Sequence, residues 1–552
     1  MLVRLTLGTA PFVLAALGCT ANISGEGTSD TGDPVVPGAP GTGPGGVAPG
    51  TGPGGAASGT LLGPSLRLLT NSQYRATLRT LFPFADELTL DLEEDVALNG
   101  LRAIGSSNVA VSLKATEAYH AIAEQAAKRA FADGATGTAF AGCNVDEAAC
   151  ATSFIADFGR RAFRRALAPE EQTKFLGIYQ AGLQKLGGGA PALQHVVLAV
   201  LGSPHFLYRA ELGEPSQSGR RLKDIEVASK LAYFLSDGPP DQELLALAEA
   251  GGLSAALEAQ ATRLLAGASF NAGIESLFDD YLSLGQLASV EKLPSAFPNF
   301  SPSLVESMRR ETLLGLSRAA SSGADFRNVF NAGKSFVNRE LAEIYGINGV
   351  SGNDFVEVEL PATRRGLLGQ ASILSLYAHA SVSSPTLRGK FVRQVLLCQA
   401  IPAPPPNVDT TLPDTSEAAT ARERFTIHRT DPACAGCHQL MDPIGLGLEN
   451  FDAIGRYREQ ENGSNIDASG DLDGVAFPGP AQLSDALARH PGLGDCLSRT
   501  VFRYAWGRLE NQADEPSIAA LGQAFAGANY GLPALLKSAV LSSGFVNVGA
   551  LD

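Results

Sequence analysis

Three residues in the C-terminal part of the chain, Cys434, Cys437 and His438, form the pattern C-x-x-C-H. Two thiols separated by two residues on one helical turn can form thioether bonds to the two vinyl groups of a single haem. The imidazole that follows them then lies against the iron. The pattern therefore predicts a covalently bound haem c, with His438 as a ligand of its iron.

The same three residues have two other interpretations. Cys434 and Cys437 could form a disulfide, or their thiolates could bind zinc together with His438. A zinc site needs a fourth ligand, however, and no second pair of cysteines stands nearby in the sequence. We favour haem, and the N-terminal export signal supports this choice.

The second axial ligand of the iron is less well defined. Met441 follows His438 by only three residues, and an extended span of roughly 10 Å hardly carries the chain around the edge of a haem. We therefore expect Met441 to pack against the haem or in the core. Met308 is expected on the buried face of an amphipathic helix. His428 stands ten residues before His438 and can reach the opposite face, so it is the favoured candidate ligand. An open iron position is an alternative. The fallback ligands are His379 and His490.

The N-terminus has the features of an export signal. Arg4 supplies a positive charge, and residues 5–17 form an apolar core that is too short to span a bilayer. Residues 16–19 (ALGC) resemble the lipobox of bacterial lipoproteins. We therefore expect a signal peptide that ends at residue 18 and acylation of Cys19. An ordinary cleaved signal peptide is the alternative.

Residues 22–59 consist almost entirely of Gly, Pro, Ala, Thr, Ser and Val. Such a composition cannot bury a core and is typical of a flexible tether. An acylated Cys19 followed by this tether would hold a folded body at a membrane surface without inserting it. No later segment is long and apolar enough for a transmembrane helix. The expected location is the bacterial cell envelope, at the outer membrane or facing the periplasm.

The rest of the 552-residue chain has the composition of an acidic globular protein. Hydrophobic residues make up 45% and charged residues 18% of the sequence. The net charge of -15 makes nucleic acids and anionic lipid surfaces poor partners. The length is enough for about three to five domains.

Seven cysteines occur in the chain. One is Cys19 and two belong to the C-x-x-C-H pattern, which leaves an even number in an oxidising compartment. Cys143 and Cys150 would close a short loop, and we expect them to pair. Cys398 and Cys496 are then assigned to each other by elimination.

Most of the folded part is predicted to be helical. A capping box at residues 70–73 opens the first helix, and Pro83 ends it. Segments with helical periodicity are residues 74–82, 111–131, 151–165, 170–186, 225–235, 241–250, 254–266, 302–321 and 335–345. Alternation at residues 355–360 predicts a strand, and residues 467–477 predict a small hairpin. The expected fold class is mainly all-α and multi-domain, with a minor β element.

Two clusters of charged residues favour structural roles. Four arginines within residues 160–165 (RRAFRR) divide between two faces of a helix, so salt bridges to neighbouring domains are favoured over an anion site. Three aspartates within residues 467–473 are arranged like a loose calcium loop, but they miss the ligand spacing of an EF-hand. We therefore expect a polar hairpin there.

Several segments together resemble a known family, the secreted planctomycete-type multidomain proteins. Residues 67–74 (RLLTNSQY), 158–165 (FGRRAFRR), 203–209 (SPHFLYR) with 231–235 (LAYFL), and 502–508 (FRYAWGR) are similar to its first, second, third and closing domains. The best match is to the family's cytochrome-like module, at residues 383–389 (SSPTLRG), 434–438 (CAGCH), 441–445 (MDPIG) and 449–452 (ENFD). The resemblance implies five domains, an exported bacterial protein and a haem, and it places a histidine at position 428.

The expected domain order follows from these segments. It comprises a signal peptide (1–18), a lipidated cysteine with its tether (19–60), an N-terminal helical domain (61–135), a small helical domain (140–204), a central helical domain (205–345), a cytochrome c-like module with the haem (362–460) and a C-terminal helical domain (480–550).

Three functions fit this organisation. The favoured one is electron transfer through one covalent haem in a membrane-anchored protein, with a redox partner protein or a small-molecule oxidant or reductant. The second is a haem-dependent oxidoreductase that acts on a small molecule or an extracellular polymer, which requires an open iron position and a pocket beside it. The third is a surface scaffold or binding protein with a structural haem. The motif is specific for the cofactor but not for its use.

Overall fold

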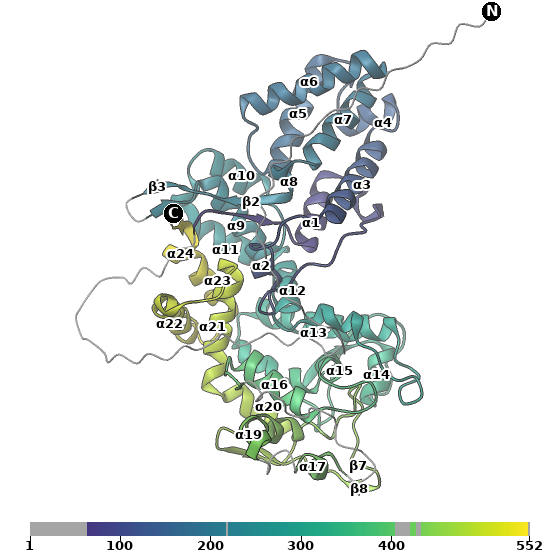
Figure 1. Ribbon diagram of the computed structural model, residues 1–552, viewed down its shortest axis with the longest axis vertical. Coiled ribbons are helices and arrows are strands. Elements are labelled where there is room, and N and C mark those ends of the chain that lie inside the picture. Colours follow the sequence, from purple (N-terminus) through teal and green to yellow (C-terminus); the bar gives the residue numbers. More distant parts are fainter. Residues whose placement is uncertain (1–62, 217–218, 403–419, 427–431, 550–552) are drawn as a thin grey trace, which may run out of the picture. The chain divides into compact units, whose positions relative to one another are not determined.

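The computed structural model describes residues 63–216, 219–402, 420–426 and 432–549 (Figure 1). Helices dominate this part of the chain, and its strands form only two- and three-stranded antiparallel sheets. The mainly all-α fold class is therefore confirmed. None of the described helices combines the length and the apolar character needed to cross a bilayer.

A first hydrophobic core is formed by the N-terminal helices. Its first helix begins where the sequence predicts, because the Thr70 hydroxyl accepts a hydrogen bond from the Gln73 amide and the Gln73 side chain accepts one from the Thr70 amide. Buried aromatic rings such as Phe131, Phe154 and Phe158 pack between the helices. The elements of this part are β1 (Ser65–Leu68), α1 (Asn71–Leu81), α2 (Arg102–Gly105), α3 (Leu113–Ala130), α4 (Gly134–Ala141), α5 (Ala148–Phe163), α6 (Pro169–Leu186), α7 (Gly189–Leu201), α8 (Pro204–Leu207) and β2 (Tyr208–Glu211).

A second and larger core joins the central segment to the C-terminal helices. Phe545, near the end of the chain, packs on Phe234 with ring centroids 5.7 Å apart, and both side chains are buried. The C-terminal helices therefore complete a core that the central helices begin. The helices of this core are α9 (Asp224–Ser236), α10 (Gln242–Glu249), α11 (Leu253–Leu265), α12 (Phe270–Tyr281), α13 (Pro302–Ser322), α15 (Ala371–Leu376), α16 (Pro385–Lys390), α19 (Pro432–Leu446), α20 (Pro480–Arg489), α21 (Pro491–Trp506), α22 (Glu515–Gly527), α23 (Leu532–Leu541) and α24 (Ser543–Val546).

Short strands and helical turns complete the fold. β4 (Gly219–Arg221) pairs with both β3 (Glu214–Ser216) and β11 (Asn547–Val548), so the last described residues hydrogen-bond to the start of the central segment. Residues 391–396 form a single π-helical turn, η5 (Phe391–Leu396), directly after α16. A short helix, α17 (Ala421–Arg424), precedes α19.

One predicted helix is partly wrong. Residues 335–337 belong to β5 (Lys334–Val337), which pairs with β6 (Val356–Glu359), and the helix α14 (Arg339–Tyr345) starts only after Asn338. The Asn338 side chain accepts a hydrogen bond from the Leu341 amide and so sets the start of the helix. The strand predicted at residues 355–360 is confirmed as β6.

The hairpin predicted at residues 467–477 is also confirmed. β9 (Gly470–Leu472) and β10 (Val475–Phe477) are joined by Asp473 and Gly474, both with positive φ (51° and 88°). An Asp-Gly pair in this conformation matches the right-handed twist of the flanking strands. A second hairpin of the same kind, β7 (Gln460–Glu461) with β8 (Ser464–Asn465), was not predicted.

The four arginines of residues 160–165 have different partners. Arg160 contacts Glu249 of α10 at 2.9 Å, as the salt-bridge prediction requires. Arg161 and Arg165 form ion pairs within their own neighbourhood instead. Arg164 is buried, and the prediction of a salt bridge is wrong for it. Its guanidinium donates to the backbone carbonyls of Ala162, His205, Phe206 and Tyr208.

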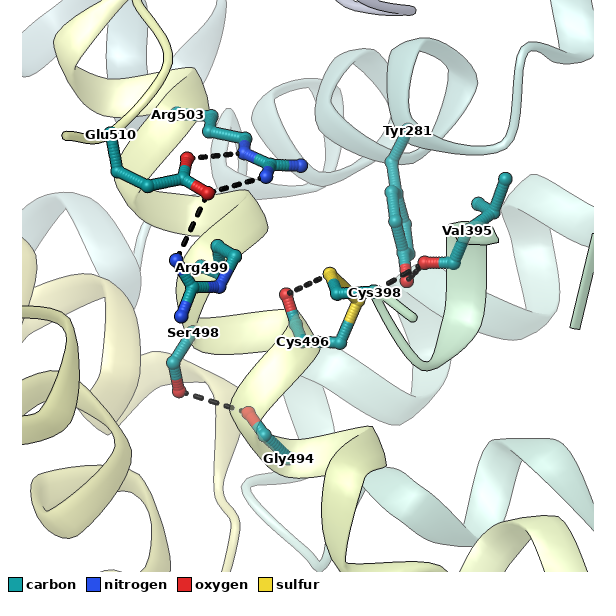
Figure 2. The surroundings of a disulfide bond; sticks show 9 residues. All are labelled: Tyr281, Val395, Cys398, Gly494, Cys496, Ser498, Arg499, Arg503 and Glu510. Carbon is teal, nitrogen blue, oxygen red and sulfur yellow. Dashed lines mark hydrogen bonds and ion pairs between the residues drawn. A yellow bond between two sulfur atoms is a disulfide. The ribbon is translucent and has the colours of Figure 1, made fainter. Parts of the chain in front are cut away.

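Both cysteine pairs assigned from the sequence are bonded in the structure, Cys143 with Cys150 and Cys398 with Cys496. The second bond ties the segment after η5 to α21 (Figure 2). Beside it, the Tyr281 hydroxyl donates to the Val395 carbonyl at 2.7 Å. This disulfide therefore links the segment that leads into α19 with the C-terminal helices.

A buried carboxyl on α13 gives the fold a predictable pH dependence. Glu311 is fully buried and accepts hydrogen bonds from the Ser335 and Tyr345 hydroxyls at 2.6 and 2.5 Å. Burial raises the pKa of Glu311 to about 7. Between its ordinary pKa of 4.5 and this value, the folded state holds a proton that the unfolded state has released.

We therefore expect this group's contribution to stability to be complete below pH 4.5 and to be lost as the pH rises towards 7. The slope is at most about 1.4 kcal/mol per pH unit. Urea unfolding at pH 5 and pH 7 measures it, and Glu311→Gln should have a smaller loss over this interval than the wild type. An identical loss in both proteins would contradict the assignment.

Candidate haem-attachment site

The three residues of the C-x-x-C-H pattern lie on one helix, α19 (Pro432–Leu446). Cys434 and Cys437 are free thiols, and both are partly buried. The alternative disulfide between them is therefore not formed. The Cys437 sulfur lies 3.2 Å from the Pro402 carbonyl oxygen, so Pro402 also borders this site.

The orientation of the His438 ring is set by a carboxylate on the next helical turn. His438 Nδ1 lies 2.9 Å from Asp442 Oδ2, and the Asp442 side chain is fully buried while that of His438 is 20% exposed. Residues four apart lie on the same face of a helix, which makes this contact local. With Nδ1 held by the carboxylate, Nε2 is the nitrogen that would face a metal.

Asp442 is in turn held by α16. The Thr386 hydroxyl donates to Asp442 Oδ1 at 2.9 Å, so both carboxylate oxygens are hydrogen-bonded. The two helices approach closely because Gly389 and Gly445 stand at the contact. A Cβ at Gly389 would lie 2.0 Å from the Met441 carbonyl oxygen, and one at Gly445 would lie 1.7 Å from the Pro385 carbonyl oxygen.

Buried ion pairs fix the chain that follows α19. Arg388 of α16 is 1% exposed and donates to the carbonyls of Leu448 and Phe451. Glu449 accepts a hydrogen bond from Ser383 and lies 3.5 Å from Arg388. Residues 383–389 and 441–452, quoted above for the family resemblance, are thus packed against each other.

The other predicted ligands have different outcomes. Met441 is 5% exposed and Met308 is fully buried in a third hydrophobic cluster, so both are core residues as expected. His490 caps the start of α21, with Nδ1 accepting from the Gly492 amide and Nε2 3.0 Å from Asp473. His379 follows α15 and its amide donates to the Val382 carbonyl. His428 and Cys19 lie outside the described residues and stay predictions.

The zinc site at the C-x-x-C-H pattern and the calcium loop at residues 467–473 gain no support from the described part of the chain. No group of three or more His, Cys, Asp and Glu side chains there could hold a metal ion. The aspartates of the hairpin already have partners in the protein. Asp473 contacts Arg393, Gln399 and His490, and Asp467 contacts Arg422. The expectation of a polar hairpin fits these contacts.

The residues present fit a c-type haem. Two unpaired thiols and an imidazole stand on one helix, and a buried carboxylate holds Nδ1 of that imidazole. Such a carboxylate is the common outer-shell partner of a metal-bound histidine, because it fixes the ring orientation and raises the basicity of the ligand. Cys434 and Cys437 would hold the porphyrin, and His438 would bind the iron.

Sequence reasoning missed Asp442 and Thr386. The i, i+4 spacing between His438 and Asp442 on a predicted helix was an available signal for the first. No local signal identified Thr386, because it reaches Asp442 only through the packing of α16 on α19.

The chain is a mainly helical multidomain protein, and its segments are similar to five families in series. Each is described as a protein of unknown function: DUF1587 at residues 67–132, DUF1595 at 150–211, DUF1592 at 222–347, DUF1588 at 364–461 and DUF1585 at 473–545. The series is consistent with the planctomycete-type multidomain family. The DUF1588 family also carries the label PSCyt3, which relates the segment containing α19 to cytochromes. No curated protein and no solved structure matches the chain.

Proposed function

We propose that this protein is an exported, membrane-anchored electron carrier with one covalent haem c. The observation that carries the proposal is the arrangement on α19, where two free thiols precede an imidazole held by a buried carboxylate. The label of the family at residues 364–461 supports a cytochrome-related role. When bound, the haem would supply one-electron redox chemistry.

Each residue of the site has a defined task in this proposal. Cys434 and Cys437 anchor the porphyrin to the helix, and Nε2 of His438 binds the iron. Asp442 holds the ring through Nδ1, and its negative charge makes the imidazole a stronger electron donor. Thr386 keeps the Asp442 carboxylate in place from the neighbouring helix.

The charge of Asp442 predicts a measurable shift of the haem potential. Asp442→Asn should keep a polar partner for His438 but remove the negative charge that favours ferric iron, so the potential should rise. We expect a shift on the order of 50 mV, close to tenfold in the equilibrium constant of a one-electron couple. Spectroelectrochemical titration measures it. Thr386→Val is the control, because it leaves the charge in place and should shift the potential less. An unchanged potential in Asp442→Asn would show that the charge of Asp442 does not tune the haem.

A test of the function itself is the spectrum of the reduced protein with and without carbon monoxide. If His428 closes the iron, the wild type is low-spin and binds carbon monoxide slowly or not at all, as an electron carrier should. His428→Ala should then bind it rapidly. Rapid binding by the wild type would instead favour an oxidoreductase that acts on a small molecule or a polymer. A near-infrared band of methionine bound to ferric iron would show that the assignment of His428 is wrong.

The membrane anchor is a separate part of the proposal and rests on the sequence ALGC at residues 16–19. Cys19→Ala should move the protein from the membrane fraction to the soluble fraction, because the acyl chains are lost. Metabolic labelling with a fatty acid should mark the wild type only. A wild type that takes up no label would be a simple secreted protein.

A further inference from the structure

A small cavity lies between the N-terminal, central and C-terminal helices, and no residue of α19 lines it. Its volume of about 30 Å³ has room for about two or three non-hydrogen atoms, judged by the space that one water molecule needs. Segments that match four of the five families contribute side chains to its wall. The residues that matter for its chemistry are Arg67, Arg102, Arg209, Lys230, Tyr233 and Asp280.

Part of the charge around this cavity is balanced within the protein. Arg102 contacts Asp279 and Asp280 at 2.7 and 3.2 Å. Asp279 also contacts Arg309 at 2.6 Å. Two guanidinium groups and two carboxylates therefore neutralise each other on this side of the cavity.

Other residues of the cavity wall carry an excess of positive charge. Arg67 and Arg209 stand directly opposite each other in the β1–β2 pair, an arrangement that is unfavourable for like charges. Lys230 of α9 joins them. Glu211 contacts two of the three cations, and it lies 3.0 Å from both Arg67 Nε and Lys230 Nζ. The other carboxylate near this part of the wall is Asp237, which lies beside the wall residues Gln73 and Ser276. Three cations therefore face two carboxylates even when Asp237 is ionised.

Arg209 is the one cation of the three that forms no direct ion pair, although Glu211 lies near enough for the two charges to interact. Arg209 is 8% exposed, and its Nε is buried without a hydrogen-bond partner. None of the ion pairs in the described part of the chain includes its guanidinium. Its guanidinium lies over the Tyr233 ring, with Cζ 5.2 Å from the ring centroid. Such a contact uses none of the five N–H donors of an arginine as a hydrogen bond to an oxyanion would. A buried charge in this state is costly unless a partner compensates it.

We propose that this cavity binds a small planar oxyanion of the size of formate, with Arg209 as its principal ligand. The planar fork of a guanidinium matches the two oxygens of a carboxylate. Arg67 and Lys230 add positive potential, since they share a single carboxylate. A tetrahedral oxyanion such as sulfate has five non-hydrogen atoms, more than the two or three for which the cavity has room. The bound anion would neutralise the junction at which β1, β2, α9 and α21 meet.

The test is the thermal unfolding midpoint of the full chain in increasing sodium formate, compared with sodium sulfate at equal ionic strength. The wild type should show a saturable rise with formate, because a ligand that binds only the folded state stabilises it. Arg209→Met should lose the saturable rise. Without formate its midpoint should equal or exceed that of the wild type, because an uncompensated charge has been removed.

Arg129→Met is the matched control, because Arg129 also lies over an aromatic ring, 4.8 Å from that of Phe84, but is exposed and does not line the cavity. It should keep the formate effect. Arg209→Lys keeps the positive charge but lacks the planar fork of the guanidinium, so the apparent affinity for formate should fall about tenfold or more. This variant tests the proposal even if Arg209→Met does not fold. The proposal is overturned if the formate effect is equal in wild type and both Arg209 variants, or if sulfate produces the same saturable rise.

Discussion

Replacing both Cys434 and Cys437 by Ala is expected to abolish covalent attachment of haem. Each thiol can form one thioether bond, so a single replacement should weaken attachment and the double replacement should leave no covalent bond. Protein matured in cells with the cytochrome c assembly machinery should lose its peroxidase stain on a denaturing gel. His438→Ala should retain the stain but lose the normal spectrum of the haem, because the proximal ligand is absent.

The control for this result is the Cys143→Ala/Cys150→Ala protein. These cysteines form a disulfide in the N-terminal part and take no part in the α19 site, so the stain should be unchanged. Retention of the stain after replacement of both α19 cysteines would show that haem, if bound, is held in another way.

The second large effect is on stability. Cys398→Ala/Cys496→Ala removes a disulfide between residues 98 apart in the sequence. In the chain-entropy account, a loop of about 100 residues corresponds to about 5 kcal/mol of stabilisation. The loop that this bond closes includes α19. The bond joins Cys398, at the start of the loop, to Cys496 on α21 (Figure 2). Chemical denaturation of the oxidised protein and of the double variant measures the difference in the free energy of unfolding.

The Cys143–Cys150 pair again provides a comparison. Its two cysteines are only 7 residues apart, which gives about 2 to 3 kcal/mol in the same account. Removal of the long-range disulfide should therefore cost clearly more than removal of the short-range one. An equal or smaller loss for Cys398–Cys496 would mean that the packing of α21, rather than the covalent link, holds this region together.

Local features of the fold could be predicted from the sequence because their causes are local. The Thr70–Gln73 capping box and the Asp473-Gly474 turn both depend on residues next to each other in the chain. Periodicity predicts a helix at residues 335–337 and misses β5, because the strand character of β5 comes from pairing with β6, about twenty residues later. Periodicity within a short segment does not carry that information.

The candidate sites also combine residues that are neighbours in the sequence with residues that only the fold brings together. The C-x-x-C-H pattern identified three residues of the α19 site, since they are neighbours in the sequence. Thr386 joins that site only through the contact between α16 and α19. Arg67 and Arg209 meet only because β1 pairs with β2, which lies more than a hundred residues further along the chain. The sequence therefore gives no sign of the excess of positive charge at the cavity.

The most direct test of the central claim is the intact mass of the denatured wild-type protein compared with that of the Cys434→Ala/Cys437→Ala variant, both matured with the haem-attachment machinery. The comparison cancels signal-peptide cleavage and acylation, which are common to both proteins. The account predicts a difference equal to one haem plus the change of two side chains. A difference that corresponds to the two side chains alone would contradict the account.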